Sequence, residues 1–138
     1  VIAEKSEDYF LIIIGVKVPV QTVCPCSKEI SNFGAHSQRA IIEILIKLNN
    51  LKEIIWYEDL FKIAEVNASS PVYELLKRED EKFITENGYN NPKFVEDVVR
   101  DITIELDRNN RVTWYKVEVL SYESIHNHQA FACIKKGS

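Results

Sequence analysis

The sequence predicts an α+β fold in which helices pack on one face of an antiparallel sheet. An apolar run that settles into alternation, from Tyr9 to Val23, indicates a long strand near the start. Segments with apolar residues at helical spacing occupy the middle of the chain. Two strand-like segments, Arg111 to Tyr122 and Ala130 to Lys135, close it as a hairpin. Strands, then helices, then strands are typical of this fold class.

The composition indicates one domain and excludes two classes of partner. A chain of 138 residues with 46% apolar residues can bury one sizeable core, so we expect a single domain over residues 1–138. A net charge of -4 disfavours binding to a nucleic-acid backbone. No segment approaches the roughly 18 uninterrupted apolar residues of a membrane span. We therefore expect no nucleic acid, no membrane and a cytoplasmic location.

The first half should contain one strand and two helices. Within the first strand, Pro19 cannot donate a backbone hydrogen bond, which favours an edge position. The polar segment 24–39 predicts a loop. Apolar residues at helical spacing then predict a helix over 40–48, and a shorter helix is expected over 58–65. The spaced residues of the first helix are Ile41, Ile44, Leu45 and Leu48.

The second half contains the clearest helix. Ser70-Pro71 and Asn91-Pro92 resemble helix starts, with a capping side chain before proline. The polar tract 77–86 fits either a helix or a loop. After Asn91 the apolar spacing defines a buried stripe of Val95, Val98, Val99, Ile102 and Leu106. In the following strand the alternation changes phase between Trp114 and Val117, which predicts a bulge.

Cys24 and His36 form the first candidate site. A thiolate and an imidazole twelve positions apart, across a loop containing Gly34, could converge on one metal ion. The spacing lacks the paired motifs of structural zinc, so an idle cysteine pair of Cys24 and Cys26 stays open. Cys133 lies among small and apolar residues, which predicts a buried structural thiol.

A second candidate site follows the strand that begins at Arg111. Glu123, His126 and His128 place a carboxylate and two imidazoles within six residues, which suits metal binding or proton transfer. The alternative is a polar hairpin loop with solvated histidines. For Glu81 and Glu96, the surrounding charges favour ordinary solvated helix faces.

Five motifs in order resemble the type IB GTP cyclohydrolases, a group that includes a bacterial folate-pathway enzyme and an archaeal methanopterin-pathway relative. The motifs are CPCSKEIS, GAHSQR, LKREDEK, NPKFVEDVVR and ESIHNH, and the match runs from about Val16 to Ala132. The resemblance implies a tunnelling fold.

The resemblance also implies roles for individual residues. Cys24, His36 and Glu81 would bind a divalent metal ion, which is Fe(II), Mn(II) or Zn(II). The residues expected beside the metal are Cys26, Glu123, His126 and His128. Glu96 would anchor the purine, because its carboxylate can accept hydrogen bonds from guanine N1 and the 2-amino group.

The implied reaction is hydrolytic opening of the guanine imidazole ring of GTP, with release of formate. The product would be a dihydroneopterin phosphate, either a triphosphate or a 2',3'-cyclic phosphate. Members of this family are about twice as long, so we expect the carboxyl-terminal half of a longer protein. We also expect a homo-oligomer with active sites at subunit interfaces, which could require the missing amino-terminal half.

Two other readings remain open. A 7-deazaguanine nitrile reductase also uses a cysteine and a purine-anchoring glutamate, although its Lys-rich nicotinamide motif is not evident here. A non-catalytic purine or pterin binding module, or an assembly domain with a structural metal, belongs to a different functional class.

Overall fold

The computed structural model describes residues 1–5, 10–48 and 54–137 and confirms the α+β class. In chain order the elements are β1 (Ile2–Lys5), β2 (Phe10–Val23), α1 (Pro25–Ile30), β3 (Ser37–Leu48), α2 (Tyr57–Asn67), β4 (Ser70–Pro71), α3 (Arg78–Asn90), α4 (Val95–Asp107), β5 (Val112–Ser121) and β6 (Ala130–Lys136). The sheet order is β1-β2-β3-β5-β6, with β4 beside β2, and all pairings are antiparallel.

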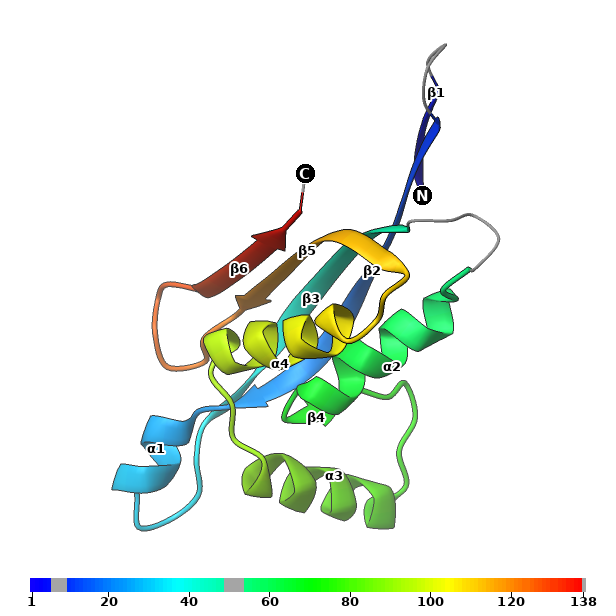
Figure 1. Cartoon of the computed structure of the whole chain (residues 1–138). Coiled ribbons are helices and arrows are strands. Elements are labelled where there is room, and N and C mark those ends of the chain that lie inside the picture. The colour runs from blue at the N-terminus through cyan, green and yellow to red at the C-terminus, as the bar shows by residue number, and fades with distance from the viewer. Residues whose placement is uncertain (6–9, 49–53, 138) are drawn as a thin grey trace.

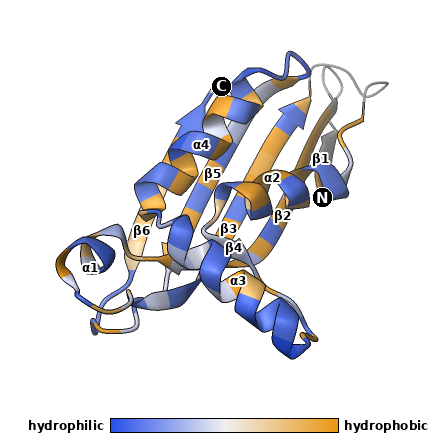
Figure 2. Cartoon of the chain, turned by 90° about the horizontal axis from the view of Figure 1, so that it is seen from below, coloured by the Kyte–Doolittle hydropathy of each residue, from blue (hydrophilic) through white to orange (hydrophobic). Residues whose placement is uncertain are grey.

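Helices α2 and α4 cover one face of the sheet (Figure 1). Both present apolar residues to the strands, whereas α3 is largely hydrophilic and lies at one end of the sheet (Figure 2). The predicted α4 stripe is confirmed, because all five of its residues are buried. The core residues that the sheet contributes alternate along β2, β3 and β5: Val16, Val18, Val20, Ala40, Ile42, Ile44, Ile46, Tyr115, Val117 and Val119.

The predicted helix over 40–48 is wrong, because this segment is the long central strand β3. Ala40, Ile42, Ile44 and Ile46 are each 0% exposed, which is the period-two pattern of a strand. The intervening apolar residues produced the helical spacing, since both faces of this strand carry large apolar side chains. Isoleucine is β-branched and favours strands, and pairing with β2 and β5 decides the conformation.

Two predicted helix starts are also wrong. Ser70-Pro71 forms β4, which pairs with Val20 and Gln21 of β2. The Asn91 side chain donates to the carbonyl of Ala68 instead of capping a helix. The helix after it begins at Val95, and the remaining helices have the expected places: α2 covers 58–65, and the tract 77–86 lies almost wholly in α3.

The predicted bulge exists, but it lies before Trp114 rather than after it. Lys47 pairs with Trp114 and Leu48 pairs with Val112, so Thr113 has no opposite residue in β3. Gly137 adopts a φ of 86° against this irregularity, where an added Cβ would lie 2.6 Å from the Thr113 carbonyl oxygen. The predicted hairpin of β5 and β6 is confirmed.

The other face of the sheet has no helix on it among the described residues. It carries ion pairs, including Lys17–Glu43 at 3.3 Å and Lys116–Glu118 at 2.8 Å. Cys133 lies exposed on this face opposite Glu118, so the predicted buried thiol is wrong. Partial desolvation, followed by the Glu118 charge, raises the pKa of the Cys133 thiol. The Cys133 thiol is therefore protonated near neutral pH.

The edge position predicted for Pro19 is confirmed. It pairs with Ile41 of β3, but no described strand pairs with β2 on its other side at this point. On that side, β1 pairs only with residues 10–13 of β2, and β4 pairs only with residues 20–21. None of the helices formed by the described residues has the length and apolar character needed to cross a membrane.

Replacing Ile42 or Ile41 by alanine tests the strand assignment. Ile42 faces the helices and is fully buried, whereas Ile41 is half-buried on the opposite face. We expect Ile42→Ala to lower the free energy of unfolding by about 4 kcal/mol and Ile41→Ala by about 1 kcal/mol, because only the first leaves a closed cavity. Urea denaturation measures both values. A larger loss for Ile41 would support the helical arrangement instead.

Candidate active site

Cys24 and His36 lie together because β2 and β3 run antiparallel. Val23 ends β2 opposite Ser37, the first residue of β3. The Cys24 backbone N–H donates to the His36 carbonyl at 3.0 Å. Ser27 braces the connection, because its hydroxyl donates to the Cys24 carbonyl at 3.0 Å and accepts the His36 N–H at 3.1 Å. The twelve-residue separation in sequence therefore closes into a short distance between backbones.

The connection itself contains α1, where the sequence predicted only a loop. Pro25 occupies the first helical turn, for which its fixed φ is suited. Lys28 donates to the Tyr89 carbonyl at 2.6 Å, and its ammonium lies 4.3 Å from the centre of the Tyr89 ring. These contacts attach α1, and with it the exposed Cys26, to the end of α3.

The turn between β5 and β6 brings the other two histidines to the same place. The Tyr122 N–H donates to the Arg39 carbonyl at 2.9 Å, which holds the start of the turn against β3. The ring centres of His36 and His126 are 6.5 Å apart, and those of His126 and His128 are 5.0 Å apart. All three histidines of the chain therefore lie in one cluster.

A cavity of about 310 Å³ opens at this end of the sheet. Seven of the eight residues predicted for the site line it: Cys24, Cys26, His36, Glu96, Glu123, His126 and His128. They come from the end of β2, α1, the start of β3, the first turn of α4 and the β5–β6 turn. The structure thus brings together residues from four separate sequence motifs.

Glu81 is the predicted residue that does not line this cavity. It is exposed on α3 and borders a neighbouring cavity of about 400 Å³. Arg39 and Tyr73 also line that second cavity, and Gln38 lines both cavities. Glu81 therefore lies at a separate cavity that shares only Gln38 with the first one.

Hydrogen bonds connect His36 to Glu123 beneath the cavity. His36 Nδ1 lies 2.8 Å from Gln38 Oε1, and Gln38 Nε2 lies 3.2 Å from Thr22 Oγ1. Thr22 Oγ1 lies 3.3 Å from Ser121 Oγ, which donates to Glu123 Oε1 at 2.7 Å. Sequence reasoning missed the three middle residues. They are polar residues at inward positions of β2, β3 and β5, where the alternation otherwise places valine, alanine, isoleucine or tyrosine, and that pattern could have identified them.

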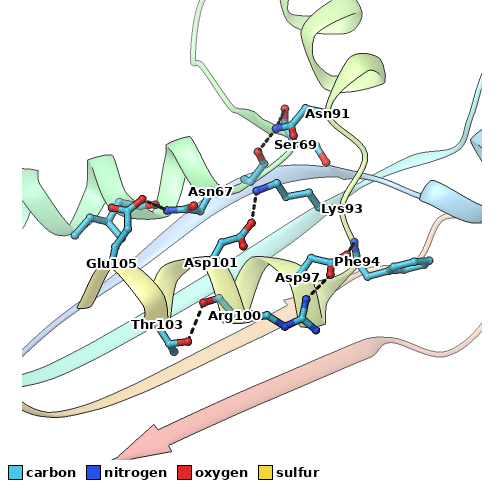
Figure 3. A network of polar contacts seen from close by, with 12 residues as sticks. Asn67, Ser69, Asn91, Lys93, Phe94, Asp97, Arg100, Asp101, Thr103 and Glu105 are labelled. Carbon is cyan, nitrogen blue, oxygen red and sulfur yellow. Dashed lines mark hydrogen bonds and ion pairs between the residues drawn. The ribbon is translucent and has the colours of Figure 1, made fainter. Parts of the chain in front are cut away.

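Two charged residues near the start of α4, Lys93 and Glu96, line the cavity. Lys93 is 17% exposed in its side chain and pairs with Asp101 at 2.6 Å (Figure 3). Arg100 pairs with Asp97 at 2.8 Å. Glu96 lies in the first turn of α4 and lines the cavity. Sequence reasoning missed Lys93, although it belongs to the NPKFVED motif.

The donors around the cavity suit a borderline divalent metal ion. Thiolate and imidazole are the ligands that Zn²⁺ and similar ions accept. Among the described residues, however, no three His, Cys, Asp or Glu side chains converge closely enough to hold an ion. Cys24 and His36 offer two donors on adjoining backbone, and further ligands would require side-chain or helix movement.

Two solved structures share the fold. An archaeosine synthase QueF-Like protein superposes with a TM-score of 0.58 at 12% identity, covering 91% of this chain and 94% of that one. A dihydroneopterin aldolase from Burkholderia thailendensis, bound to guanine, gives 0.55 at 11% identity, covering 93% and 92%. These neighbours confirm the predicted tunnelling fold.

Sequence relatives are much closer than the structural neighbours. A protein of Dictyoglomus turgidum named GTP cyclohydrolase FolE2 is 64% identical over 98% of this chain. The protein of the same name from Thermotoga maritima is 61% identical over 98% of the chain. Both matches cover 51% of the relative, so the chain spans about half the length of these relatives.

A family model described as type I GTP cyclohydrolase folE2 matches residues 1–132. That range includes all five motifs and every residue predicted for the site. The resemblance to GTP cyclohydrolases is thereby confirmed at the level of type I, and the chain belongs to the folE2 family of these enzymes.

Proposed function

We propose that this chain supplies the catalytic cavity of a metal-dependent GTP cyclohydrolase. The observation that carries the proposal is the convergence of seven predicted residues on one cavity. The names of relatives that match 98% of the chain support the same activity. The reaction opens the guanine imidazole ring by hydrolysis and releases formate, giving a 7,8-dihydroneopterin triphosphate or 2',3'-cyclic phosphate.

Cys24 and His36 would hold Fe(II), Mn(II) or Zn(II), with Glu81 as a third ligand if α3 approaches the cavity. The donor types favour this assignment, since thiolate, imidazole and carboxylate all bind such ions. A bound ion would supply the Lewis acidity that activates water for hydrolysis. Cys26, on α1, lines the same cavity as Cys24 and His36 and would lie beside the bound ion.

His126 is the proposed proton carrier during attack at guanine C8 and ring opening. The centre of its ring lies 6.5 Å from that of His36, and the side chain lines the cavity, so His126 could reach both the metal position and a bound substrate. Neutral imidazole can accept a proton and later donate it. Glu123, held by the Ser121 hydroxyl, would orient His126 or the attacking water, and His128 stacks against His126.

Glu96 is the proposed guanine anchor. Its carboxylate can accept hydrogen bonds from N1 and the 2-amino group, which are both donors. Arg100 and Lys93 pair with Asp97 and Asp101, so the nearby cations are directed to other carboxylates. The Burkholderia aldolase, a protein of the same fold, is bound to guanine.

We also propose that active sites form between copies of the chain or with the rest of a longer protein. Exposed apolar residues are sequence neighbours of residues that line the cavity: Ile125, at 64% exposure, precedes His126, and Phe131, at 58%, follows Ala130. β6 is the last strand of the sheet among the described residues, so its outer edge can accept another strand.

Formate release tests the catalytic proposal. Protein loaded in turn with Fe(II), Mn(II) and Zn(II) is incubated with GTP, and formate is measured against protein without metal. We expect formate with at least one ion. If guanine binds and no ion gives formate, the chain is a purine-binding module, which is the alternative function.

Alanine substitutions at Cys24 and His36 test the metal assignment. We expect each change to lower Zn²⁺ affinity at least tenfold, because each removes a direct ligand. Cys133→Ala is the matched control, since Cys133 lies on the opposite face of the sheet. Competition with a chromophoric chelator measures all three affinities. Wild-type affinity in both the Cys24 and His36 variants would refute the assignment.

Glu96→Ala tests the guanine anchor. We expect guanine affinity to fall about 100-fold, because two charge-assisted hydrogen bonds are lost, while metal content is unchanged. Glu58→Ala is the matched control, since Glu58 occupies the same helical position in α2. Isothermal titration with guanosine gives both constants. Equal affinity in the two variants would place the purine elsewhere.

A further inference from the structure

The hydrogen-bonded path from His36 to Glu123 has a fixed direction. Thr22 and Ser121 are 1% and 0% exposed, and Gln38 is 9% exposed, so water has little access to the middle of the path. Each of the two hydroxyl groups carries one proton, and an ionised carboxylate carries none. The donor and the acceptor of each hydrogen bond in the path can therefore be assigned in turn, starting from Glu123.

Only one arrangement of the hydroxyl protons and the Gln38 amide satisfies every contact. Ser121 must give its proton to Glu123, at 2.7 Å. Thr22 must then give its proton to Ser121, since the Ser121 proton is already used. Thr22 consequently accepts from Gln38, which requires the Gln38 amide nitrogen to face it. The Gln38 carbonyl oxygen is left facing His36.

The reverse arrangement lacks a proton. If the Gln38 amide were flipped, Thr22 would have to donate to Gln38, and Ser121 would still donate to Glu123. Two hydroxyl oxygens would then face each other at 3.3 Å with no hydrogen between them. Unpaired polar contacts of this kind are costly at buried positions.

We propose that the Glu123 carboxylate fixes the tautomer of His36 through Ser121, Thr22 and Gln38. A carbonyl oxygen can only accept, so neutral His36 carries its proton on Nδ1 and leaves the Nε2 lone pair free. The inference rests on the proposed function insofar as that lone pair would bind the metal. Glu123 and the three middle residues act here as positioning residues, because none of them needs to touch the ion.

Histidine tautomers can be measured without metal or substrate. Long-range ¹H–¹⁵N correlation spectra distinguish the two ring nitrogens, and the chain has three histidines to assign. Under mildly alkaline conditions, in which free histidine is neutral, we expect metal-free wild-type protein to show His36 as the Nδ1–H form. The Nε2–H form in the wild-type protein would overturn the inference.

Ser121→Ala breaks the path and releases the Thr22 proton. The Gln38 amide can then flip, so we expect His36 to become a mixture of tautomers and Zn²⁺ affinity to fall about tenfold. Ser124→Ala is the matched control, because the Ser124 hydroxyl lies 3.5 Å from both His36 Nδ1 and Gln38 Oε1 but outside the path. It should keep the wild-type tautomer.

Thr22 provides a second pair of variants in case Ser121→Ala fails to fold. Thr22→Val removes the hydroxyl and should give mixed tautomers, whereas Thr22→Ser keeps it and should preserve the Nδ1–H form. A single wild-type tautomer in both Ser121→Ala and Thr22→Val would overturn the inference. If wild-type His36 is Nδ1–H and responds to these variants while Zn²⁺ does not bind, the tautomer inference is supported and the proposed metal chemistry fails.

Discussion

The antiparallel pairing of β2 with β3 is the constraint on which the rest of the structure depends. It runs from Ile13 opposite Lys47 to Val23 opposite Ser37. With β3 held in place by β5, a slip of one residue would turn the buried side chains of β2 to the open face. The same slip would separate Thr22 from Gln38 and displace the backbone contact of Cys24 with His36. Core and candidate site are therefore set by one register.

Local patterns in the sequence predicted the parts of the fold in which one face is buried. Helix α4 was predictable because charged residues separate its apolar residues in the sequence, so that the helical spacing of the buried stripe is clear. Strand β3 was mistaken for a helix because isoleucine and leucine occupy both of its faces, so period two and helical spacing fitted equally well. Its neighbours in the sheet decide between the two, and those neighbours are far away in the sequence.

The candidate site shows the same division between local and long-range information. The residues themselves identified Cys24, Cys26 and the three histidines, because reactive side chains stand out at loop positions, whereas Glu96 was assigned only by the family resemblance. Gln38 and Ser121 were missed, since each resembles an ordinary polar residue until the sheet places it under the cavity. Glu81 was assigned by resemblance alone, and its position depends on how α3 packs, which no motif specifies.

Pro19 has a consequence for how the protein behaves in crowded solution. It lies in the stretch of β2 that has a neighbour on one side only among the described residues. A strand without a neighbour can recruit strands from other molecules and so begin fibril growth. Proline removes a donor from this stretch. The longest strand is thereby a poor template for aggregation, although its side chains are strongly hydrophobic.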